Sequence, residues 1–297
     1  MSSPRPTLRV AVTGASGKTG AAVVAGLLEA GHRPVGLVRR PEAAEALQTS
    51  GAEARVVDLD GGRDDLVAAL ADVDAVHHVP PNMHPAEDEL TASVVEAAEA
   101  AGVDRFVYHS VLHPYVPAMP HHLRKAVSEL RVRRSALRWT ILQPASYAQN
   151  LLPFWEAARD TGTYRVPYDV DRPFTPVDLA DVAAAVVAVL DDPATAHGTF
   201  ELVGPEVLTS RDMAAALGEA AGRPVVAEPQ PVAQWRAGVD PSGTRRDLDD
   251  LAAMFDWYDT HGLVGSSLAL RTLLGREPTT LRAALRRDLG LGTTPAP

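Results

Sequence analysis

The sequence predicts an α/β protein with a doubly wound parallel sheet and a second, smaller part that is mostly helical. Three observations support this expectation. A short apolar run at residues 8–12 is followed by glycines at Gly14, Gly17 and Gly20, an amphipathic helix, and a second apolar run at 34–38. Strand and helix patterns then alternate, which is typical of parallel sheets. The strand segments lack polar alternation, as expected for strands buried on both faces.

The glycine turn predicts a dinucleotide-binding unit of the Rossmann type, because strand, glycine turn, helix and strand follow within about 30 residues. The first glycine would make the tight turn, the second would admit the pyrophosphate, and the third would let the helix meet the strand. The phosphates would lie at the helix N-terminus. A glycine turn that binds nothing is the alternative, and the flanking strand and helix disfavour it. A P-loop is excluded because its first glycine would fall on Val12. The expected cofactor loop is Gly14, Ala15, Ser16, Gly17, Lys18, Thr19 and Gly20.

The remaining elements follow from apolar periodicity and from turn residues. In the first half we expect strands at 54–57, 75–79, 105–108 and 139–142, and helices at 41–50, 64–70, 86–101 and 121–135. In the second half we expect helices at 147–160, 179–190 and 210–221, strands at 164–166, 198–203 and 225–228, a strand-like turn at 174–177, and a mostly helical segment at 231–289. Residues 1–150, completed by parts of 170–205, would form the NAD(P)-binding Rossmann domain. Residues 151–297 would form the smaller substrate-covering part.

Composition excludes several functional classes. With 28 basic and 38 acidic residues the formal charge is −10, which argues against a general nucleic-acid binder. The absence of cysteine excludes disulfides, thiol catalysis and thiolate metal sites. The first residues lack the apolar core of a signal peptide, and the longest apolar run, 182–190, is far shorter than the roughly 20 residues of a membrane span. We therefore expect a soluble, cytoplasmic protein that binds neither nucleic acid nor membrane.

The end of the second strand predicts which cofactor binds. NAD-binding proteins usually place an acidic residue about 20 residues after the glycines, where it holds the ribose 2′-hydroxyl. This chain has Arg39 and Arg40 there, and its first acid is Glu42. A guanidinium pairs with a 2′-phosphate that a carboxylate would repel. NADP(H) is therefore expected in preference to NAD(H), although either arginine could be a solvated surface charge.

Two further strand ends supply candidate cofactor contacts. Asp58 and Leu59 follow the third strand, where a side chain commonly meets the adenine. Val79, Pro80 and Pro81 end the fourth strand and would border the nicotinamide. Both expectations follow from the rule that ligands bind outside the carboxyl ends of parallel strands.

The catalytic candidates follow the fifth strand. Short-chain dehydrogenases use a serine together with Tyr-x-x-x-Lys on the next helix. Here Ser110 and Lys125 are present, but the residue four before the lysine is His121. A histidine can serve as a general acid because its ordinary pKa lies near neutrality, or it can be a polar residue packed at the helix start. His121, Tyr108 or water would supply the proton.

Several segments together resemble the NmrA-like group of atypical short-chain dehydrogenase/reductases. They include the 14–20 turn, the 38–40 strand end, the His121-x-x-x-Lys125-x-x-x-Glu129 pattern, and the stretches 137–150, 175–193, 254–265 and 273–281. The resemblance covers essentially the whole chain and implies NADP(H) binding. Some relatives reduce quinones, aromatic dyes or isoflavones, and others act as redox-sensing regulators through protein partners. The lysine of isoflavone-type reductases maps to Lys125.

The resemblance also suggests what lies beside the nicotinamide and the substrate. The segment formed by Pro144, Ala145, Ser146 and Tyr147 is expected against the nicotinamide, and Asn150 matches the family pattern. Phe154 and Trp155 could wall a pocket for a flat substrate, although aromatic rings at helical spacing are more often core.

A metal site is not expected, even though seven of the ten histidines fall between His77 and His122. His77 and His78 on one strand point to opposite faces, and no acidic residue stands at a ligand spacing to them. The sequence thus predicts an NADP(H)-dependent oxidoreductase that reduces a small apolar or aromatic conjugated substrate. The alternative is a non-catalytic NADP(H) sensor. A homodimer or a regulatory protein partner stays open.

Overall fold

The computed structural model describes residues 6–238 and 245–291. The chain divides into two compact units. Unit 1 comprises residues 1–115, 122–143 and 180–200, and unit 2 comprises residues 116–121, 144–179 and 201–297. The predicted boundary near residue 150 stays a prediction.

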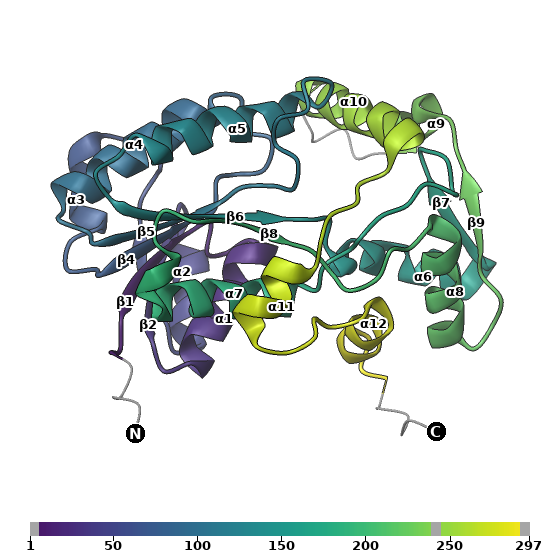
Figure 1. The fold of residues 1–297 in the computed structure, drawn as a ribbon, viewed down its shortest axis with the longest axis horizontal. Coiled ribbons are helices and arrows are strands. Elements are labelled where there is room, and N and C mark those ends of the chain that lie inside the picture. The colour runs from purple at the N-terminus through teal and green to yellow at the C-terminus, as the bar shows by residue number, and fades with distance from the viewer. Residues whose placement is uncertain (1–5, 239–244, 292–297) are drawn as a thin grey trace. The chain divides into compact units, whose positions relative to one another are not determined.

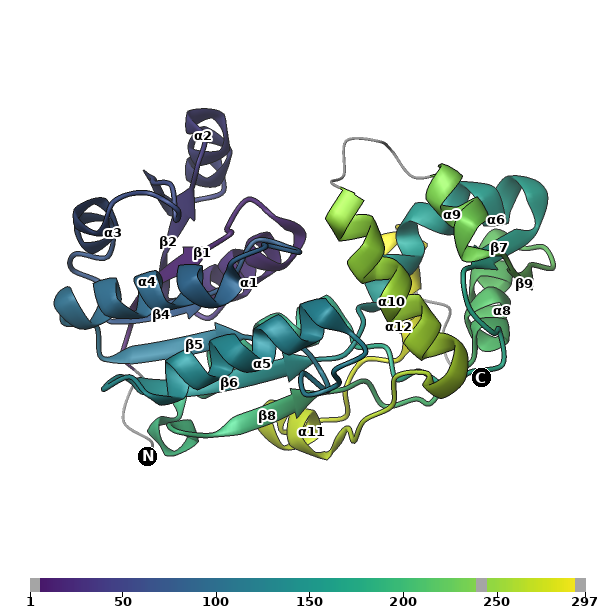
Figure 2. The ribbon, with the colours of Figure 1, turned by 90° about the horizontal axis from the view of Figure 1, so that it is seen from above.

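Unit 1 is built on a seven-stranded sheet in the order β3-β2-β1-β4-β5-β6-β8. The neighbouring pairs from β3 to β6 are parallel. The first six strands have the order of the dinucleotide-binding fold, which confirms the predicted fold class. The strand order reverses between β1 and β4, the parallel neighbours that Figure 2 shows side by side. The strands are β1 (Arg9–Thr13), β2 (Arg33–Val38), β3 (Glu53–Val56), β4 (Ala75–His78), β5 (Arg105–His109), β6 (Arg138–Pro144) and β8 (Thr199–Leu202).

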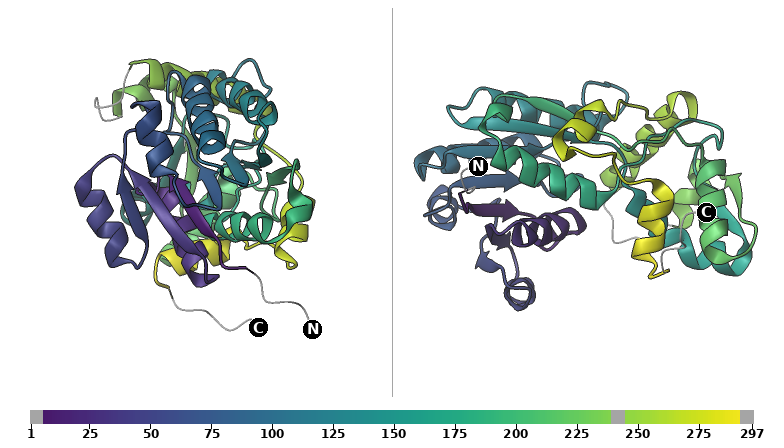
Figure 3. Two further views of the ribbon diagram at one scale, coloured as in Figure 1. Left: turned by 90° about the vertical axis from the view of Figure 1, so that its left-hand side faces the viewer. Right: turned by 60° about the horizontal axis from the view of Figure 1, so that its bottom comes forward.

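Helices cover both faces of this sheet. Helices α3, α4 and α5 lie on one face and α1 and α7 on the other (Figure 1), and the two views of Figure 3 show the same layers. The core on the first face includes Phe106, Tyr108 and Ile141, all fully buried. The helices are α1 (Lys18–Glu29), α2 (Pro41–Thr49), α3 (Arg63–Ala69), α4 (Glu87–Ala100), α5 (Pro120–Arg133) and α7 (Leu179–Asp191), with a 3₁₀ turn η2 (Pro193–Thr195).

Unit 2 contains helices and a two-stranded parallel sheet of β7 (Thr163–Val166) and β9 (Val226–Pro229). Isolated bridges join Phe174 to Leu208 and to Leu263, in the place of the expected strand-like turn. The helices are α6 (Trp155–Thr161), α8 (Ser210–Ala221), α9 (Val232–Gly238), α10 (Arg245–His261), α11 (Leu268–Leu274) and α12 (Leu281–Asp288). The expected helical segment 231–289 includes residues 239–244, which lie outside the described residues.

One predicted helix was wrong in kind. The segment 147–160 forms a 3₁₀ helix η1 (Ala148–Phe154) followed by α6. Pro153 lies inside η1 and has no backbone N–H to donate to the preceding turn, so the α-helical ladder starts only after it. Other element ends differ from the predicted ones by one or two residues, which is the usual uncertainty of helix and strand ends.

Candidate active site

The glycine turn folds tightly upon itself at the end of β1. Gly14 has a φ of +61°, which favours glycine, and the Gly17 N–H donates to the Gly14 carbonyl at 2.9 Å. A Cβ atom on Gly20 would lie 2.2 Å from that same carbonyl oxygen. Gly14 therefore makes the tight turn and Gly20 allows the helix to meet the strand, as predicted.

The turn ends at the N-terminus of α1. The N-cap is Gly17, which has no side chain to accept from the first-turn N–H groups, and the first turn contains no acidic residue. Ser16, Gly17 and Lys18 are exposed, whereas Ala15 is fully buried. Partial burial lowers the pKa of Lys18 from its ordinary value. Backbone donors and the helix dipole together make such a helix start suitable for an anion.

The side chain of Thr13 ties the ends of β1 and β4 together. Its hydroxyl accepts from the Val79 N–H at 2.8 Å and donates to the Val79 carbonyl at 3.1 Å. The same oxygen lies 2.9 Å from His78 Nδ1, and His78 Nε2 lies 3.4 Å from the Thr91 hydroxyl. Val79 is half-buried and Pro80 buried, while Pro81 is exposed. The ends of β1 and β4 thus lie in close contact where the strand order reverses, because a Cβ on Gly14 would lie 3.0 Å from the Val79 carbonyl.

The side chains expected to select the cofactor lie at the ends of β2 and β3. Arg39 and Arg40 are exposed just past β2, and Arg40 is the N-cap of α2. Within the described residues neither guanidinium has an ion-pair partner. Asp58 is exposed and its carboxylate accepts from the Asp60 N–H at 3.2 Å, while Leu59 is buried. Both arginines are therefore available to an anion from solvent.

The Lys125 ammonium belongs to a polar cluster formed by three elements. Its Nζ donates to Glu87 Oε1 at 3.0 Å, and the Tyr108 hydroxyl donates to the same oxygen at 2.6 Å. Glu87 begins α4, Tyr108 lies in β5 and Lys125 in α5. The Lys125 side chain is 17% exposed and that of Glu87 3%. Burial, followed by the charge of Glu87, raises the pKa of Tyr108 well above its ordinary value.

A second buried carboxylate, Glu129, lies one turn further along α5. Its Oε1 accepts from the Ser110 hydroxyl and from Gln143 Nε2, each at 2.6 Å. Its Oε2 accepts from the Tyr115 hydroxyl and from Arg133, each at 3.2 Å. Because a carboxylate only accepts hydrogen bonds, the Ser110 proton is committed to Glu129 and the Ser110 oxygen is left as an acceptor.

The histidines of this region are mostly buried. His121 lies one helical turn before Lys125 on α5 and is half-buried. Burial lowers the pKa of His122 to about 4, and its Nδ1 lies 3.3 Å from the His113 carbonyl. His77 and His109 pack edge to face with ring centroids 5.5 Å apart. Across the described ranges, 6–238 and 245–291, no group of three or more potential ligands could hold a metal ion.

The residues expected near the nicotinamide and substrate lie in unit 2. Pro144 and Ala145 are buried, Ser146 and Tyr147 half-buried, and Asn150 exposed. The Ser146 carbonyl accepts from the Val177 N–H at 2.9 Å, which holds this segment beside residues 175–178. Half-buried Phe154 packs edge to face on Tyr164 at 5.0 Å, and Trp155, also half-buried, begins α6.

Three polar residues that were not singled out from the sequence support this segment. Gln149 accepts from the Leu179 N–H at 3.0 Å and donates to Asp178 at 2.8 Å. Arg287 of α12 donates to both oxygens of Asp178, at 2.6 and 2.9 Å. Gln149 and Asp178 occur in the family-like stretches 137–150 and 175–193, which was the available signal. Glu87 carried no signal beyond being an acid at the start of a helix.

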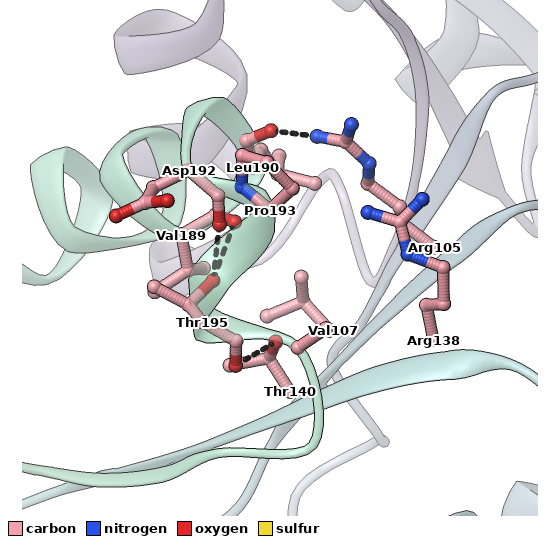
Figure 4. Close-up of a pocket in the computed structure, with 10 residues that line it drawn as sticks. Arg105, Val107, Arg138, Thr140, Val189, Leu190, Asp192, Pro193 and Thr195 are labelled. Carbon is pink, nitrogen blue, oxygen red and sulfur yellow. Dashed lines mark hydrogen bonds between the residues drawn. The ribbon is translucent and has the colours of Figure 1, made fainter.

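A hollow at the opposite edge of the unit 1 sheet has a structural explanation. Figure 4 shows Arg105 and Arg138, at the starts of β5 and β6, beside the carboxyl end of α7. Arg105 donates to the Leu190 carbonyl and so caps α7. The threonine hydroxyls there donate to nearby carbonyls, Thr140 to Thr195 and Thr195 to Val189. We therefore assign no ligand to this hollow.

Among the described residues, no helix is long and apolar enough to span a membrane.

The sequence is similar to those of known proteins. The sequence model of the NmrA-like family matches residues 6–283. The NAD(P)H azoreductase of Xenophilus azovorans is 34% identical over 218 residues, which cover 73% of this chain and 75% of that protein. Quinone oxidoreductase 2 of Escherichia coli is 28% identical over 275 residues, which cover 92% of this chain and 96% of that protein.

Solved structures have the same fold. The crystal structure of the NADPH-dependent quinone oxidoreductase of Escherichia coli, complexed with NADPH, matches with a TM-score of 0.82 at 26% identity and covers 94% of this chain and 99% of that one. The triphenylmethane reductase of Citrobacter sp., complexed with NADP(H), matches in fold with a TM-score of 0.82 at 24% identity, covering 94% and 99%.

Proposed function

The chain belongs to the NmrA-like family, and from that premise we propose that it is an NADP(H)-dependent oxidoreductase that reduces a small, conjugated, apolar or aromatic substrate. The observation that carries the proposal is the carboxyl edge of the unit 1 sheet. It combines an exposed helix start behind a tight glycine turn with a partly exposed lysine on α5, which shares the Glu87 carboxylate with Tyr108 of β5. The related azoreductase and quinone oxidoreductase support a conjugated, electron-poor substrate such as a quinone or enone.

The residues of the glycine turn fit a dinucleotide. A Cβ on Gly17 would be 3.3 Å from the Gly14 carbonyl and would occupy space on the exposed side of the helix start. The N–H groups of α1 would hold the pyrophosphate, with Asp58 and Leu59 towards the adenine and Val79, Pro80 and Pro81 towards the nicotinamide. When bound, the nicotinamide supplies a hydride to the substrate.

Three side chains would then serve the reaction. Lys125 would donate to the nicotinamide ribose and polarise the substrate oxygen. Ser110, whose proton is held by Glu129, would accept a hydrogen bond rather than donate one. His121 or water would deliver the proton, because Tyr108 is fully buried and donates to Glu87. In unit 2, Pro144, Ala145, Ser146 and Tyr147 would border the nicotinamide, and Asn150, Phe154 and Trp155 the substrate.

The activity is tested by incubating the protein with NADPH and a panel of quinones, azo dyes and aromatic enones. Oxidation of NADPH is followed by the loss of its near-ultraviolet absorbance. Lys125→Ala should lower kcat/KM by roughly a hundredfold, since one preorganised donor at developing charge is worth about that much. Turnover that is unchanged in Lys125→Ala would remove the lysine from the proposal.

The cofactor preference is tested with Arg39→Asp combined with Arg40→Ala. Each charge-assisted pair with a 2′-phosphate is worth about 1.5–3 kcal/mol, so fluorescence titration should show NADPH affinity falling at least tenfold while NADH affinity holds. Arg63→Ala, at the exposed start of α3, is the control for a general loss of positive charge. Equal NADPH and NADH affinity in the parent protein would contradict the arginine argument.

A non-catalytic NADP(H) sensor is the second candidate, and the histidine at position 121 favours it because a tyrosine proton donor is missing there. Tight NADPH binding without turnover across the whole panel would support the sensor and exclude the reductase. Turnover that depends on Lys125 would do the reverse.

A further inference from the structure

We propose that Glu87 is the positioning residue for Lys125 and that Tyr108 fixes the Glu87 carboxylate, so that the three side chains act as one unit. This inference rests on the proposed function, because it describes how the lysine of that site is held. Neither Glu87 nor the pairing is visible in the sequence, where Glu87 and Lys125 are 38 positions apart.

The contacts of the Glu87 carboxylate fix its orientation towards Lys125. Its side chain is 3% exposed, and a buried carboxylate is costly unless it is paired and hydrogen-bonded. A single oxygen, Oε1, accepts from both Lys125 Nζ at 3.0 Å and the Tyr108 hydroxyl at 2.6 Å. The two donors converge from different elements, so the carboxylate cannot turn away from the ammonium without losing Tyr108.

The same contacts orient the lysine. A lysine side chain has four rotatable bonds and loses about 1.5–2 kcal/mol of rotamer freedom when it is fixed. Here the Tyr108 ring also lies 5.8 Å from Nζ, so the ammonium has an apolar wall beside its carboxylate partner. An ammonium has three N–H donors, and the Glu87 bond uses one of them. Two donors therefore remain for the ribose and the substrate.

Among the described residues, Glu87 is the only acid in direct contact with the Lys125 ammonium. The other titratable groups that its charge affects are His78 of β4, His109 of β5 and His122 of α5, and all three have lowered pKa values. These histidines are neutral near pH 7 and add no positive charge beside the ammonium. Tyr108 is also neutral, because its pKa is raised. Glu87 is thus the charged partner of Lys125 in this cluster.

The test is a double-mutant cycle between Glu87→Gln and Lys125→Met, with Glu89→Gln as the control. The glutamine keeps the shape and an acceptor oxygen but removes the charge, while Glu89 is an exposed acid in the same helical turn. Loss of one charge-assisted hydrogen bond should lower kcat for 1,4-naphthoquinone about tenfold or more in the otherwise unchanged protein. In the Lys125→Met background the same substitution should change kcat less than about twofold, because Glu87 acts through the lysine.

The conservative variant separates positioning from a structural role. Glu87→Asp keeps the negative charge beside the ammonium, so kcat should return towards the parent value in Glu87→Asp and stay low in Glu87→Gln. Equal losses in the parent and Lys125→Met backgrounds, or equal kcat for Glu87→Gln and Glu87→Asp, would overturn the proposal. If Glu87→Gln is too unstable to assay, Tyr108→Phe removes only the second donor and should lower kcat in the same direction, with the thermal midpoint measured alongside.

The outcome can be distinguished from a failure of the proposed function. If the parent protein binds NADPH but reduces nothing, the reductase proposal fails. The cycle is then measured on the NADPH dissociation constant, where Glu87→Gln should weaken binding only when Lys125 is present. A Glu87→Gln effect on NADPH affinity that is the same with and without Lys125 would overturn the positioning role on its own.

Discussion

The two sides of the candidate site in unit 1 are built in different ways. The glycine turn between β1 and α1 is made of backbone, and its shape depends on the absence of side chains at Gly14 and Gly20. The region between α4, β5 and α5 is made of buried polar side chains, with Glu87 and Glu129 each collecting donors from several elements. The glycine turn, the backbone-built region, depends on steric room. The cluster between α4, β5 and α5, the side-chain-built region, depends on electrostatic pairing. Different substitutions and different conditions should therefore disrupt the two regions.

The largest effect is expected from Gly20→Ala in the backbone-built region. Its Cβ would lie 2.2 Å from the Gly14 carbonyl and 2.7 Å from the Ala15 Cα, and neither backbone atom can move aside. We expect the free energy of unfolding in urea to fall by more than about 4 kcal/mol, which is the range of severe steric substitutions. Gly62→Ala is the matched control, because its Cβ would meet its nearest atom, of Asp65, at 3.7 Å. A Gly20→Ala protein as stable as that control would show that the turn can open at little cost.

The next effect tests the side-chain-built region. Glu129→Ala leaves Ser110, Gln143, Tyr115 and Arg133 without their common acceptor. Breaking a buried charged network from one side costs about 3–5 kcal/mol, and urea unfolding should show a loss of that size. Glu96→Ala, at an exposed position of α4, should change stability by less than about 0.5 kcal/mol. A small loss in Glu129→Ala would mean that water replaces the carboxylate.

Acid should act on three buried histidines of β4 and β5, of which His78 packs beside Tyr108 of the side-chain-built region. Burial lowers the pKa of His77 and of His78 to about 3 and that of His109 well below its ordinary value. The unfolded chain takes up these protons near pH 6.5 and the folded protein does not, so stability is present above that pH and is lost as the pH falls from 6.5 towards 3. Each histidine contributes about 1.4 kcal/mol per pH unit in this window.

The measurement is urea unfolding at pH 7, 6, 5 and 4.5. His77→Leu should reduce the slope of stability against pH by about one proton, whereas His261→Leu, at an exposed position of α10, should leave it unchanged. Equal slopes for the parent and His77→Leu would show that His77 becomes protonated in the folded state.

The contrast between the two regions also explains what the sequence predicted. Glycines at fixed spacing behind a strand report a backbone shape directly, so Gly14 and Gly20 could be assigned before the structure was known. The doubly wound fold class could be inferred because alternating buried strands and helices have few allowed topologies. Glu87 could not be assigned, because an acid at a helix start is common and its partner lies on another helix. Tyr108 is a candidate proton donor from its place at the strand end, and only the fold shows that its hydroxyl is buried and donates to Glu87.

Unit 2 also contains features that could not be predicted from the sequence, for different physical reasons. Most of its helices and strands match the predicted ranges, but Pro153 interrupts the α-helix expected at 147–160, and the first part of that segment is 3₁₀. Asp178 contacts Gln149 from 29 positions away and Arg287 from 109 positions away, and periodicity reports only local patterns. Side chains that bond across such separations are predictable only from the fold.

The smallest change in stability is expected from Gly17→Ala, which separates folding from binding within the backbone-built region. Gly17 has φ −82° and ψ 166°, a conformation open to alanine, and its Cβ would lie 3.3 Å from the Gly14 carbonyl. The lower entropy of the unfolded chain offsets this close contact, so stability should change by less than about 1 kcal/mol. The added methyl group would nevertheless stand at the exposed helix start where the pyrophosphate is proposed to bind. Fluorescence titration should therefore show NADPH affinity falling about tenfold, equivalent to about 1.4 kcal/mol. If Gly17→Ala binds NADPH as the parent does, the phosphates lie elsewhere and only the steric role of the turn remains.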